Sequence, residues 1–290
     1  MQASTLLVRK RPVAVLLLFR RDEASMKSCL GEFGVDATGV MERIGQRTGV
    51  AVILVEEDSG QNRIMLSAEA NATLSPSEFA TELLPAAFVS QQSSTDVTQP
   101  DMVVLQLKIP LPTVLQILTT AHASNIPVPL NPAPAQPPPD KYYKFIDHLV
   151  INETEAMILS GCNAADLEVS GSRSTDGLER VAALFHARGV PHVFITLGRQ
   201  GVYFSGPRAA GLVLAEKAKV VDTTAAGDTF VGAYALAAVQ ARHSGTELDV
   251  EQAVRAANKA AAKTVEKKGA QDSIHGLTSC GNRSPDVVER

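Results

Sequence analysis

Between residues 101 and 195 the chain alternates short apolar runs with segments of helical periodicity. The run at residues 102–107 is typical of a strand covered on both faces, and apolar residues at helical spacing follow it over 111–118. Further strands are predicted at residues 126–130, 148–151 and 192–196. Such alternation predicts an α/β fold, a parallel sheet wrapped by helices, which binds ligands beyond the carboxyl ends of its strands.

Outside this region the periodicity predicts additional elements. Residues 13–19 are predicted as a buried strand and Ser75-Pro-Ser-Glu78 as a helix start, with Ser75 as the cap and Glu78 three residues later. Two strands at residues 50–55 and 63–66 flank the turn signal at 58–60, which predicts a small β flap. The remaining predicted helices cover residues 22–33, 153–159, 178–185, 224–241 and 250–265.

Composition excludes several functional classes. The chain has 290 residues, of which 45% are hydrophobic, too many for a disordered protein. A net charge of -4 provides no electrostatic reason to expect a nucleic-acid partner. No apolar run reaches the roughly 18 residues that a membrane span needs, so no membrane partner is expected.

The cysteines and the N-terminus bear on the cellular compartment. Three cysteines without metal-type spacing indicate reduced thiols in an intracellular protein, expected in the cytoplasm with the nucleus as a second compartment. Residues 1–21 are basic and free of acids, so an organellar targeting segment is the alternative to a buried strand with charged ends. The strand interpretation is preferred.

The most informative segment for chemistry is Val221-Asp-Thr-Thr-Ala-Ala-Gly-Asp-Thr-Phe230. Its small residues lead into a long predicted helix, so the backbone N–H groups of Ala225, Ala226 and Gly227 are expected to form an anion hole for a phosphate. Asp228, at the same place, can take a proton from an attacking hydroxyl. An anion hole and a base together are what phosphoryl transfer to an alcohol requires.

The same spacing has a structural alternative. Thr223 or Thr224 could cap the helix, with Asp228 only complementing the helix dipole. Other motifs do not decide between the anion hole and the helix cap. The sequence has no Walker A loop and no Gly-x-Gly-x-x-Gly helix start, and it has no His-Glu-x-x-His or Gly-x-Ser-x-Gly motif.

The segment from Asp222 to Phe230 resembles the signature of the PfkB family of carbohydrate kinases, and within it the ribokinases. The resemblance extends from about Asp22 to Ser273 with its motifs in order. It implies a ribokinase-like αβα sandwich, with residues 1–290 as a single domain and 48–67 as a partial β lid. The other matching segments are residues 34–36, 48–52, 130–135, 152–155, 196–201 and 268–271.

The resemblance assigns roles residue by residue. Asp228 matches the catalytic base that acts on the sugar hydroxyl, and Ala225, Ala226 and Gly227 match the anion hole. Asn152 matches a contact of the nucleotide phosphates, and Glu155 matches the acid that organises Mg²⁺. The nucleotide-binding turn would comprise Thr196, Leu197, Gly198, Arg199, Gln200 and Gly201, with Asn258 near the adenine. K⁺ would be held largely by backbone oxygens at Asp222, Thr224, Thr264, Lys267, Gly269 and Ser273.

These assignments also have structural alternatives. Asn152 could cap a helix, with Glu155 completing a capping box. Gly198 and Gly201 could turn a hairpin. The expected function is nevertheless ATP-dependent phosphorylation of a pentose, D-ribose to ribose 5-phosphate, with Mg²⁺ and K⁺ as cofactors and a homodimer formed through the lid.

The sugar-binding half departs from the family pattern. The family's first strand and its Gly-Gly-Lys-Gly-Ala-Asn helix start do not occur, so residues 1–21 are atypical and the fold is expected to be N-terminally truncated. Lys108 stands where the family has a sugar-contacting Glu, and Glu69 where a Gly is usual. These departures leave two alternatives: a non-catalytic nucleotide-binding remnant, or a family kinase for another sugar or a nucleoside.

Overall fold

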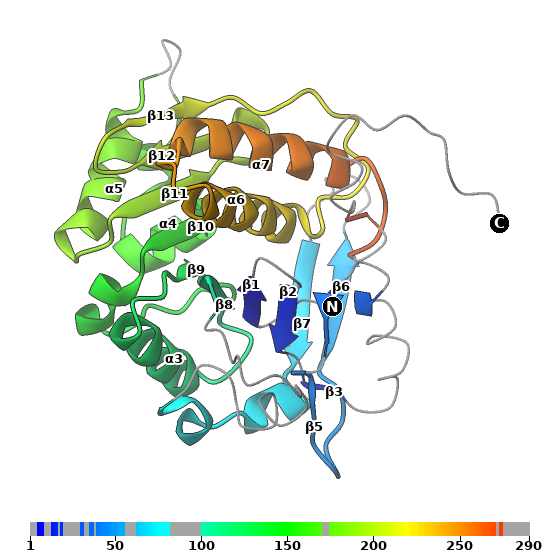
Figure 1. Ribbon diagram of the computed structural model, residues 1–290. Coiled ribbons are helices and arrows are strands. Elements are labelled where there is room, and N and C mark those ends of the chain that lie inside the picture. Colours follow the sequence, from blue (N-terminus) through cyan, green and yellow to red (C-terminus); the bar gives the residue numbers. More distant parts are fainter. Residues whose placement is uncertain are drawn as a thin grey trace.

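A central sheet lies between two layers of helices in the computed structural model (Figure 1). The structure describes residues 5–8, 13–16, 18–19, 30–31, 35–37, 39–55, 62–81, 100–169, 174–270 and 273–274. Within these ranges, nine strands form one sheet in the order β13-β12-β11-β10-β9-β8-β1-β2-β4. The predicted α/β architecture is therefore confirmed.

The middle of the sheet is parallel, as the alternation predicts. Strands β8 (Met102–Gln106), β9 (Pro129–Asn131), β10 (His148–Asn152) and β11 (His192–Thr196) pair in parallel, so their carboxyl ends share one edge. Both flanks are antiparallel: β12 pairs with β11 and β13, and β1 pairs with β8 and β2. The flanking strands are β12 (Val202–Ser205), β13 (Ala210–Val213), β1 (Thr5–Val8), β2 (Val13–Leu16) and β4 (Val35–Asp36).

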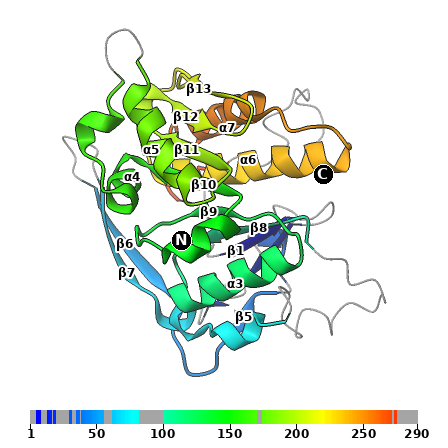
Figure 2. The same cartoon turned by 90° about the vertical axis from the view of Figure 1, so that its left-hand side faces the viewer.

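Alternating side chains of β8 separate the two halves of the core. Val103 and Leu105 belong to a cluster with α3 (Leu111–Ala123), α4 (Glu153–Ser160) and α5 (Asp176–Ala187). Met102 and Val104 point the other way, into a cluster with α6 (Ala226–His243) and α7 (Val250–Thr264). Because both faces are covered, β8 is apolar almost throughout. Figure 2 shows α3, α4 and α5 on the side of the sheet away from α6 and α7.

Strands β6 (Val50–Val55) and β7 (Asn62–Ser67) form the predicted antiparallel flap, separate from the main sheet. The turn signal at residues 58–60 lies outside the described residues. In the flap, Val52 is paired directly with Met65, and both side chains are exposed. The flap therefore presents apolar surface that the described residues leave uncovered.

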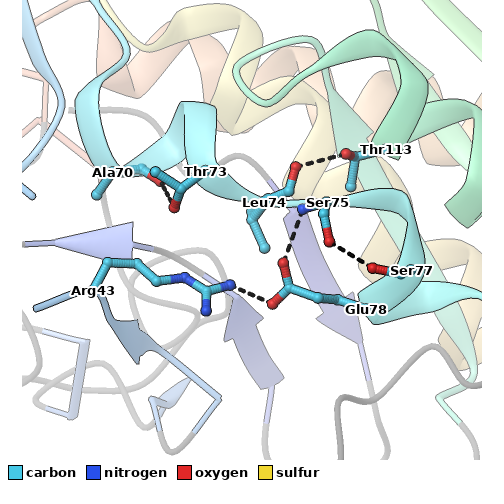
Figure 3. A network of polar contacts seen from close by, with 8 residues as sticks. All are labelled: Arg43, Ala70, Thr73, Leu74, Ser75, Ser77, Glu78 and Thr113. Carbon is cyan, nitrogen blue, oxygen red and sulfur yellow. Dashed lines mark hydrogen bonds and ion pairs between the residues drawn. The ribbon is translucent and has the colours of Figure 1, made fainter.

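Polar contacts at the base of the flap tie the N-terminal half to α3 (Figure 3). The Glu78 carboxylate accepts hydrogen bonds from the Arg43 guanidinium and from the Ser75 N–H, the latter at 2.8 Å. Thr113 Oγ1 of α3 donates to the Leu74 carbonyl oxygen at 2.7 Å. The capping box predicted at Ser75 is present, but the helix it starts, η2 (Pro76–Phe79), is a single 3-10 turn.

The other 3-10 helices in the described ranges are η1 (Glu69–Thr73), η3 (Asp140–Phe145), η4 (Ala164–Leu167) and η5 (Gly198–Gln200).

Several predicted boundaries are wrong. The single strand predicted at residues 13–19 is divided between two sheets, because β2 joins the main sheet while β3 (Leu18–Phe19) pairs with β5 (Met41–Glu42). Helix α6 begins at Ala226 rather than at residue 224, and β13 is not predicted. Of the helix predicted at residues 22–33, only residues 30–31 are described.

Strand β9 is shorter than the predicted strand at residues 126–130, and hydrogen bonds explain the difference. The Ile126 N–H donates to the Ala121 carbonyl of α3, and the Val128 N–H donates to the Asp147 carboxylate at 2.8 Å. Pro127 and Pro129 lack N–H groups. The carbonyl oxygens of Pro127 and Val128 still accept from the Val103 and His148 N–H groups, but regular strand pairing begins only at Pro129, and β9 delivers Asn131 to the carboxyl edge.

A pair of histidines, His148 buried and His192 half-buried, lies at the opposite, amino edge of the sheet. His148 and His192 begin β10 and β11 in register, with ring centroids 4.8 Å apart. The Tyr234 hydroxyl is hydrogen-bonded to His148 Nδ1 at 3.0 Å. Burial and, after it, the neighbouring His192 lower the pKa of His148 from 6.5 to about 3. The folded protein therefore holds His148 neutral.

In the described part of the chain, no helix has the length and apolarity that crossing a bilayer requires.

Candidate functional site

Polar side chains from four elements meet at the carboxyl edge of the sheet. Gln106 ends β8, Asn131 ends β9, Glu155 lies in the first turn of α4, and Asp228 lies in the first turn of α6. Gln106 Nε2 donates to Asp228 Oδ1 at 2.6 Å. The Asp228 side chain is only half-buried, so it stands at the edge where α/β sheets bind ligands rather than sealed in the core.

A chain of hydrogen bonds connects the two acids. The same Gln106 Nε2 donates to Asn131 Oδ1 at 3.1 Å, and Asn131 Nδ2 donates to Glu155 Oε2 at 3.3 Å. Asn131 Nδ2 also donates to the Val150 carbonyl oxygen at 2.9 Å. Two side-chain amides therefore bridge from Asp228 to Glu155.

Asn152 and Glu155 form the capping box that was the structural alternative. The Glu155 N–H donates to Asn152 Oδ1 at 2.8 Å, and the Asn152 N–H donates to Glu155 Oε2 at 2.9 Å. Burial raises the pKa of Glu155, which is 6% exposed, and the Asn152 N–H and the Lys108 ammonium oppose that rise. The capping box is compatible with a role in ligand binding, because it places the Glu155 carboxylate at the carboxyl edge of β10.

Lys108 brings a positive charge to the same place. Burial lowers the pKa of this lysine, while Asp228 and Glu155 act electrostatically to raise it. The half-buried ammonium group therefore lies within electrostatic range of both acids. The departure noted at Lys108 in the sequence therefore puts a cation into this site, beside Asp228 and Glu155.

The start of α6 has no side-chain cap, so the proposed capping by Thr223 or Thr224 is wrong. Ala225 is the N-cap, with a left-handed φ of 63°. The Ala226 N–H donates to the Thr223 carbonyl at 3.3 Å, so this amide, expected to be uncovered, is engaged in a backbone turn.

Gly227 lies in open space at this helix start. Thr229 donates the first i→i−4 hydrogen bond, to Ala225 at 2.9 Å, so the Gly227 N–H precedes the helical ladder. A Cβ added at Gly227 would meet no atom within 4 Å. An anion can therefore approach the positive end of α6 beside Asp228.

Two of the residues predicted to hold K⁺, Thr224 and Gly269, contact a third, Asp222. The Thr224 N–H donates to Asp222 Oδ1 at 2.9 Å, and the Gly269 N–H donates to Oδ2 at 3.0 Å. Hydrogen bonds from Thr224, and after them from Gly269, lower the pKa of Asp222. The Lys267 N–H donates to the Thr264 carbonyl at 3.2 Å. The segments at 222–224 and 264–269 are therefore side by side.

Ser273 is fully buried, and among the described residues its hydroxyl has no hydrogen-bond partner. In the described ranges, His, Cys, Asp and Glu side chains form no group of three or more that could hold a metal ion. A cation at Asp222 would therefore depend on backbone and hydroxyl oxygens.

The predicted nucleotide-binding turn connects β11 to β12, an antiparallel pair, so its glycines do turn a hairpin. Thr196 ends β11, Leu197 is buried, and Arg199 and Gln200 are exposed in η5. Gly201 has a φ of 109°, and a Cβ there would collide with the Val213 carbonyl oxygen. Gly198, in contrast, faces open space.

Asn258 is buried beneath the segment that follows β13. Its Nδ2 donates to the carbonyl oxygens of Leu214 at 3.3 Å and Val213 at 3.4 Å. Leu214, Val220 and Val221 are exposed apolar side chains in the chain between β13 and α6. Asn258 thus positions a backbone segment with apolar surface, a feature that sequence reasoning missed.

Sequence reasoning also missed Gln106 and Asn131 as site residues. Each is a polar residue at the carboxyl end of a buried strand, the position where ligand contacts are expected in an α/β sheet. That placement was a sufficient signal, but the chemical roles assigned from the resemblance did not include them.

Comparison with known proteins places these features in a family context. The profile of the family described as "pfkB family carbohydrate kinase" matches residues 13–276. A ribokinase from Haemophilus influenzae is 35% identical over 250 residues, which cover 86% of this chain and 73% of that protein. A deoxyribokinase from Salmonella typhi is 31% identical over 249 residues, which cover 86% of this chain and 73% of that protein.

Among solved structures, an Arabidopsis thaliana ribokinase complexed with ribose and ATP is similar to this chain with a TM-score of 0.72 and 27% identity. The match covers 92% of this chain and 80% of the plant protein.

Proposed function

Because this chain belongs to the pfkB family of carbohydrate kinases and is thus a sugar kinase, we propose that it transfers the γ-phosphoryl group of ATP to D-ribose. The product would be ribose 5-phosphate. The observation that carries the proposal is the position of Asp228, hydrogen-bonded at the carboxyl edge of the sheet beside the open, uncapped start of α6. The solved structures similar to this chain include a ribokinase complexed with ribose and ATP, which supports ribose and ATP as the proposed substrates.

The chemistry follows from that position. Asp228 takes the proton from the primary hydroxyl of the sugar, the hydroxyl oxygen attacks the γ-phosphorus, and the bond from phosphorus to the bridging oxygen of ADP breaks. The charge on the migrating phosphoryl group is met by the N-terminal end of α6, where Gly227 is exposed and its N–H precedes the helical ladder.

The nucleotide would lie along the ends of β10 and β11. Asn152 is exposed at the end of β10, and the turn from Thr196 to Gly201 extends beyond β11. The apolar surface of Leu214, Val220 and Val221 is suited to covering a base. Asn258 supports this surface through the Leu214 carbonyl.

Two cations fit the residues present. Mg²⁺ would neutralise charge on the ATP phosphates, and the buried Glu155 carboxylate would organise it. K⁺ would fit between the segments joined through Asp222 and Gly269, where the Ser273 hydroxyl is buried without a partner among described residues. The matching positions are Asp222, Thr224, Thr264, Lys267, Gly269 and Ser273.

A substrate panel tests the proposed function. Purified protein with MgATP is expected to release ADP in response to D-ribose, and to do so more slowly when Na⁺ replaces K⁺. The panel includes 2-deoxy-D-ribose, a nucleoside and fructose 6-phosphate, because Lys108 changes the acceptor side and one relative is a deoxyribokinase. ATP binding without stimulation by any sugar would favour the non-catalytic alternative.

The exposed apolar side chains of the flap suggest how two copies of the protein would assemble. Val50, Val52 and Met65 expose apolar surface on the flap, and Val52 and Met65 face each other across its two strands. We propose that two copies bury these flaps against each other. Replacing Val52 with Lys is expected to weaken the dimer about tenfold or more, because a charge then enters an apolar interface.

Light scattering after size exclusion, measured over a dilution series, gives the dimer dissociation constant. Ile158→Lys on α4 is the matched control, since Ile158 is a β-branched residue of similar exposure away from the flap. A wild-type protein that is monomeric throughout the series would contradict the proposal.

A further inference from the structure

Gln106 is a buried polar side chain at the carboxyl edge of the sheet. Its side chain is 6% exposed, and its Nε2 donates two hydrogen bonds, to Asp228 Oδ1 at 2.6 Å and to Asn131 Oδ1 at 3.1 Å. It contacts the proposed base directly, yet nothing in the proposed chemistry uses it.

The direction of the hydrogen bonds fixes how this amide is oriented. Asn131 Nδ2 donates to the Val150 carbonyl oxygen, which can only accept, so Asn131 must present its oxygen to Gln106. Gln106 must then present its NH₂ group to Asn131. Turning the Gln106 amide over would set its oxygen against the oxygens of Asn131 and Asp228. The Val150 carbonyl of β10 therefore fixes the orientation of the Asn131 amide, and Asn131 fixes that of Gln106. As a result, Gln106 presents an N–H donor, not an oxygen, to Asp228.

This arrangement has an energetic cost at Gln106 itself. Gln106 Oε1 is buried and has no hydrogen-bond partner among the described residues. An unsatisfied buried polar atom costs about 1–3 kcal/mol. An apolar side chain of the same length would lose the two donated bonds but would also remove this orphaned oxygen. Stability alone therefore provides little reason for a glutamine here.

We propose that Gln106 is a positioning residue for the phosphoryl transfer. Its NH₂ group holds the Asp228 carboxylate toward the acceptor hydroxyl and, through Asn131, fixes it relative to Glu155. Gln106 itself does not touch the reacting atoms. The inference rests on the proposed function, because it assumes that Asp228 is the base.

Replacing Gln106 with Met tests the inference. Met keeps the length of the side chain, removes both donations and removes the orphaned oxygen. The kcat with ribose is expected to fall about tenfold, because a positioned base is lost, while the KM for ATP stays within about twofold. The urea midpoint is expected to stay near that of the wild type. A purely structural role would lower the urea midpoint and leave kcat of the folded protein unchanged.

Gln116→Met on α3 is the matched control. Gln116 donates to Thr120 Oγ1 at 3.1 Å, away from the site, so the same substitution there is expected to leave kcat unchanged. If the Gln106→Met protein does not fold, Gln106→Glu replaces it. Glu keeps the shape but sets an acceptor against Asp228, and a kcat loss of tenfold or more is again expected.

The outcomes separate this inference from the proposed function. A folded Gln106 variant with wild-type kcat overturns the positioning role. If that variant is normal while Asp228→Asn is inactive, Asp228 remains the base and only the inference fails. If Asp228→Asn also turns over at the wild-type rate, the base assignment itself is lost.

Discussion

Replacing Asp228 with Asn is expected to lower kcat for the sugar about a thousandfold while ATP still binds. The substitution removes the proton acceptor, and general-base catalysis contributes about 10²–10⁴-fold to such reactions. Asn has the same shape as Asp, and its Oδ1 can still accept the hydrogen bond from Gln106 Nε2, so the side chain is expected to keep its position. Steady-state ADP release gives kcat, and titration calorimetry gives the affinity for ATP.

Asp176→Asn is the matched control for this experiment. Asp176 is an exposed acid in the first turn of α5, where its charge complements the helix dipole. It has no role in the proposed mechanism. If Asp228 only complements the dipole of α6, the two variants should behave alike. Wild-type turnover in Asp228→Asn would exclude Asp228 as the base.

Acid is expected to destabilise the protein through His148. The pKa of His148 is lowered from 6.5 to about 3 in the folded state, so between these values the unfolded chain takes up a proton that the folded chain does not. Stability is therefore unaffected by this group above pH 6.5 and falls as the pH decreases below it. At pH 5 the loss is about 2 kcal/mol, since each pH unit contributes about 1.4 kcal/mol.

Urea unfolding at pH 7.5 and pH 5.0 measures the effect. His148→Phe is expected to reduce the difference in unfolding free energy between the two pH values by about 2 kcal/mol, although it lowers stability at both because the Tyr234 hydroxyl loses its partner. His122→Phe, at an exposed position on α3, provides the control. An unchanged difference in the His148 variant would show that another group governs acid sensitivity.

The local pattern of the sequence was sufficient for most of the core fold. Strand β8 and helix α3 were predicted because a doubly covered strand is apolar throughout and a helix repeats every 3.6 residues, and both signals lie within a short window. The capping boxes at Ser75 and Asn152 were predicted for the same reason, because their partners are three residues apart.

Boundaries that depend on distant partners were not predicted. Strand β9 starts at Pro129 because Val128 bonds with Asp147, nineteen residues away, and the apolar run alone contains no sign of that bond. Residues 13–19 form a uniform apolar run, yet their pairing partners divide them between two sheets. Strand pairing is a property of the partner as much as of the strand.

Residue types and their spacing were enough to identify the available chemistry: an acid at the start of a helix made of small residues, a capping pair at Asn152 and Glu155, and a hairpin with two glycines. How these parts act together depends on the fold. The fold places Gln106 and Asn131 between Asp228 and Glu155, leaves the start of α6 without a side-chain cap, and puts the Lys108 ammonium near both acids. These contacts could not be predicted because hydrogen bonds and charge interactions depend on distances of a few ångströms, and parallel strands bring residues far apart in sequence to one edge.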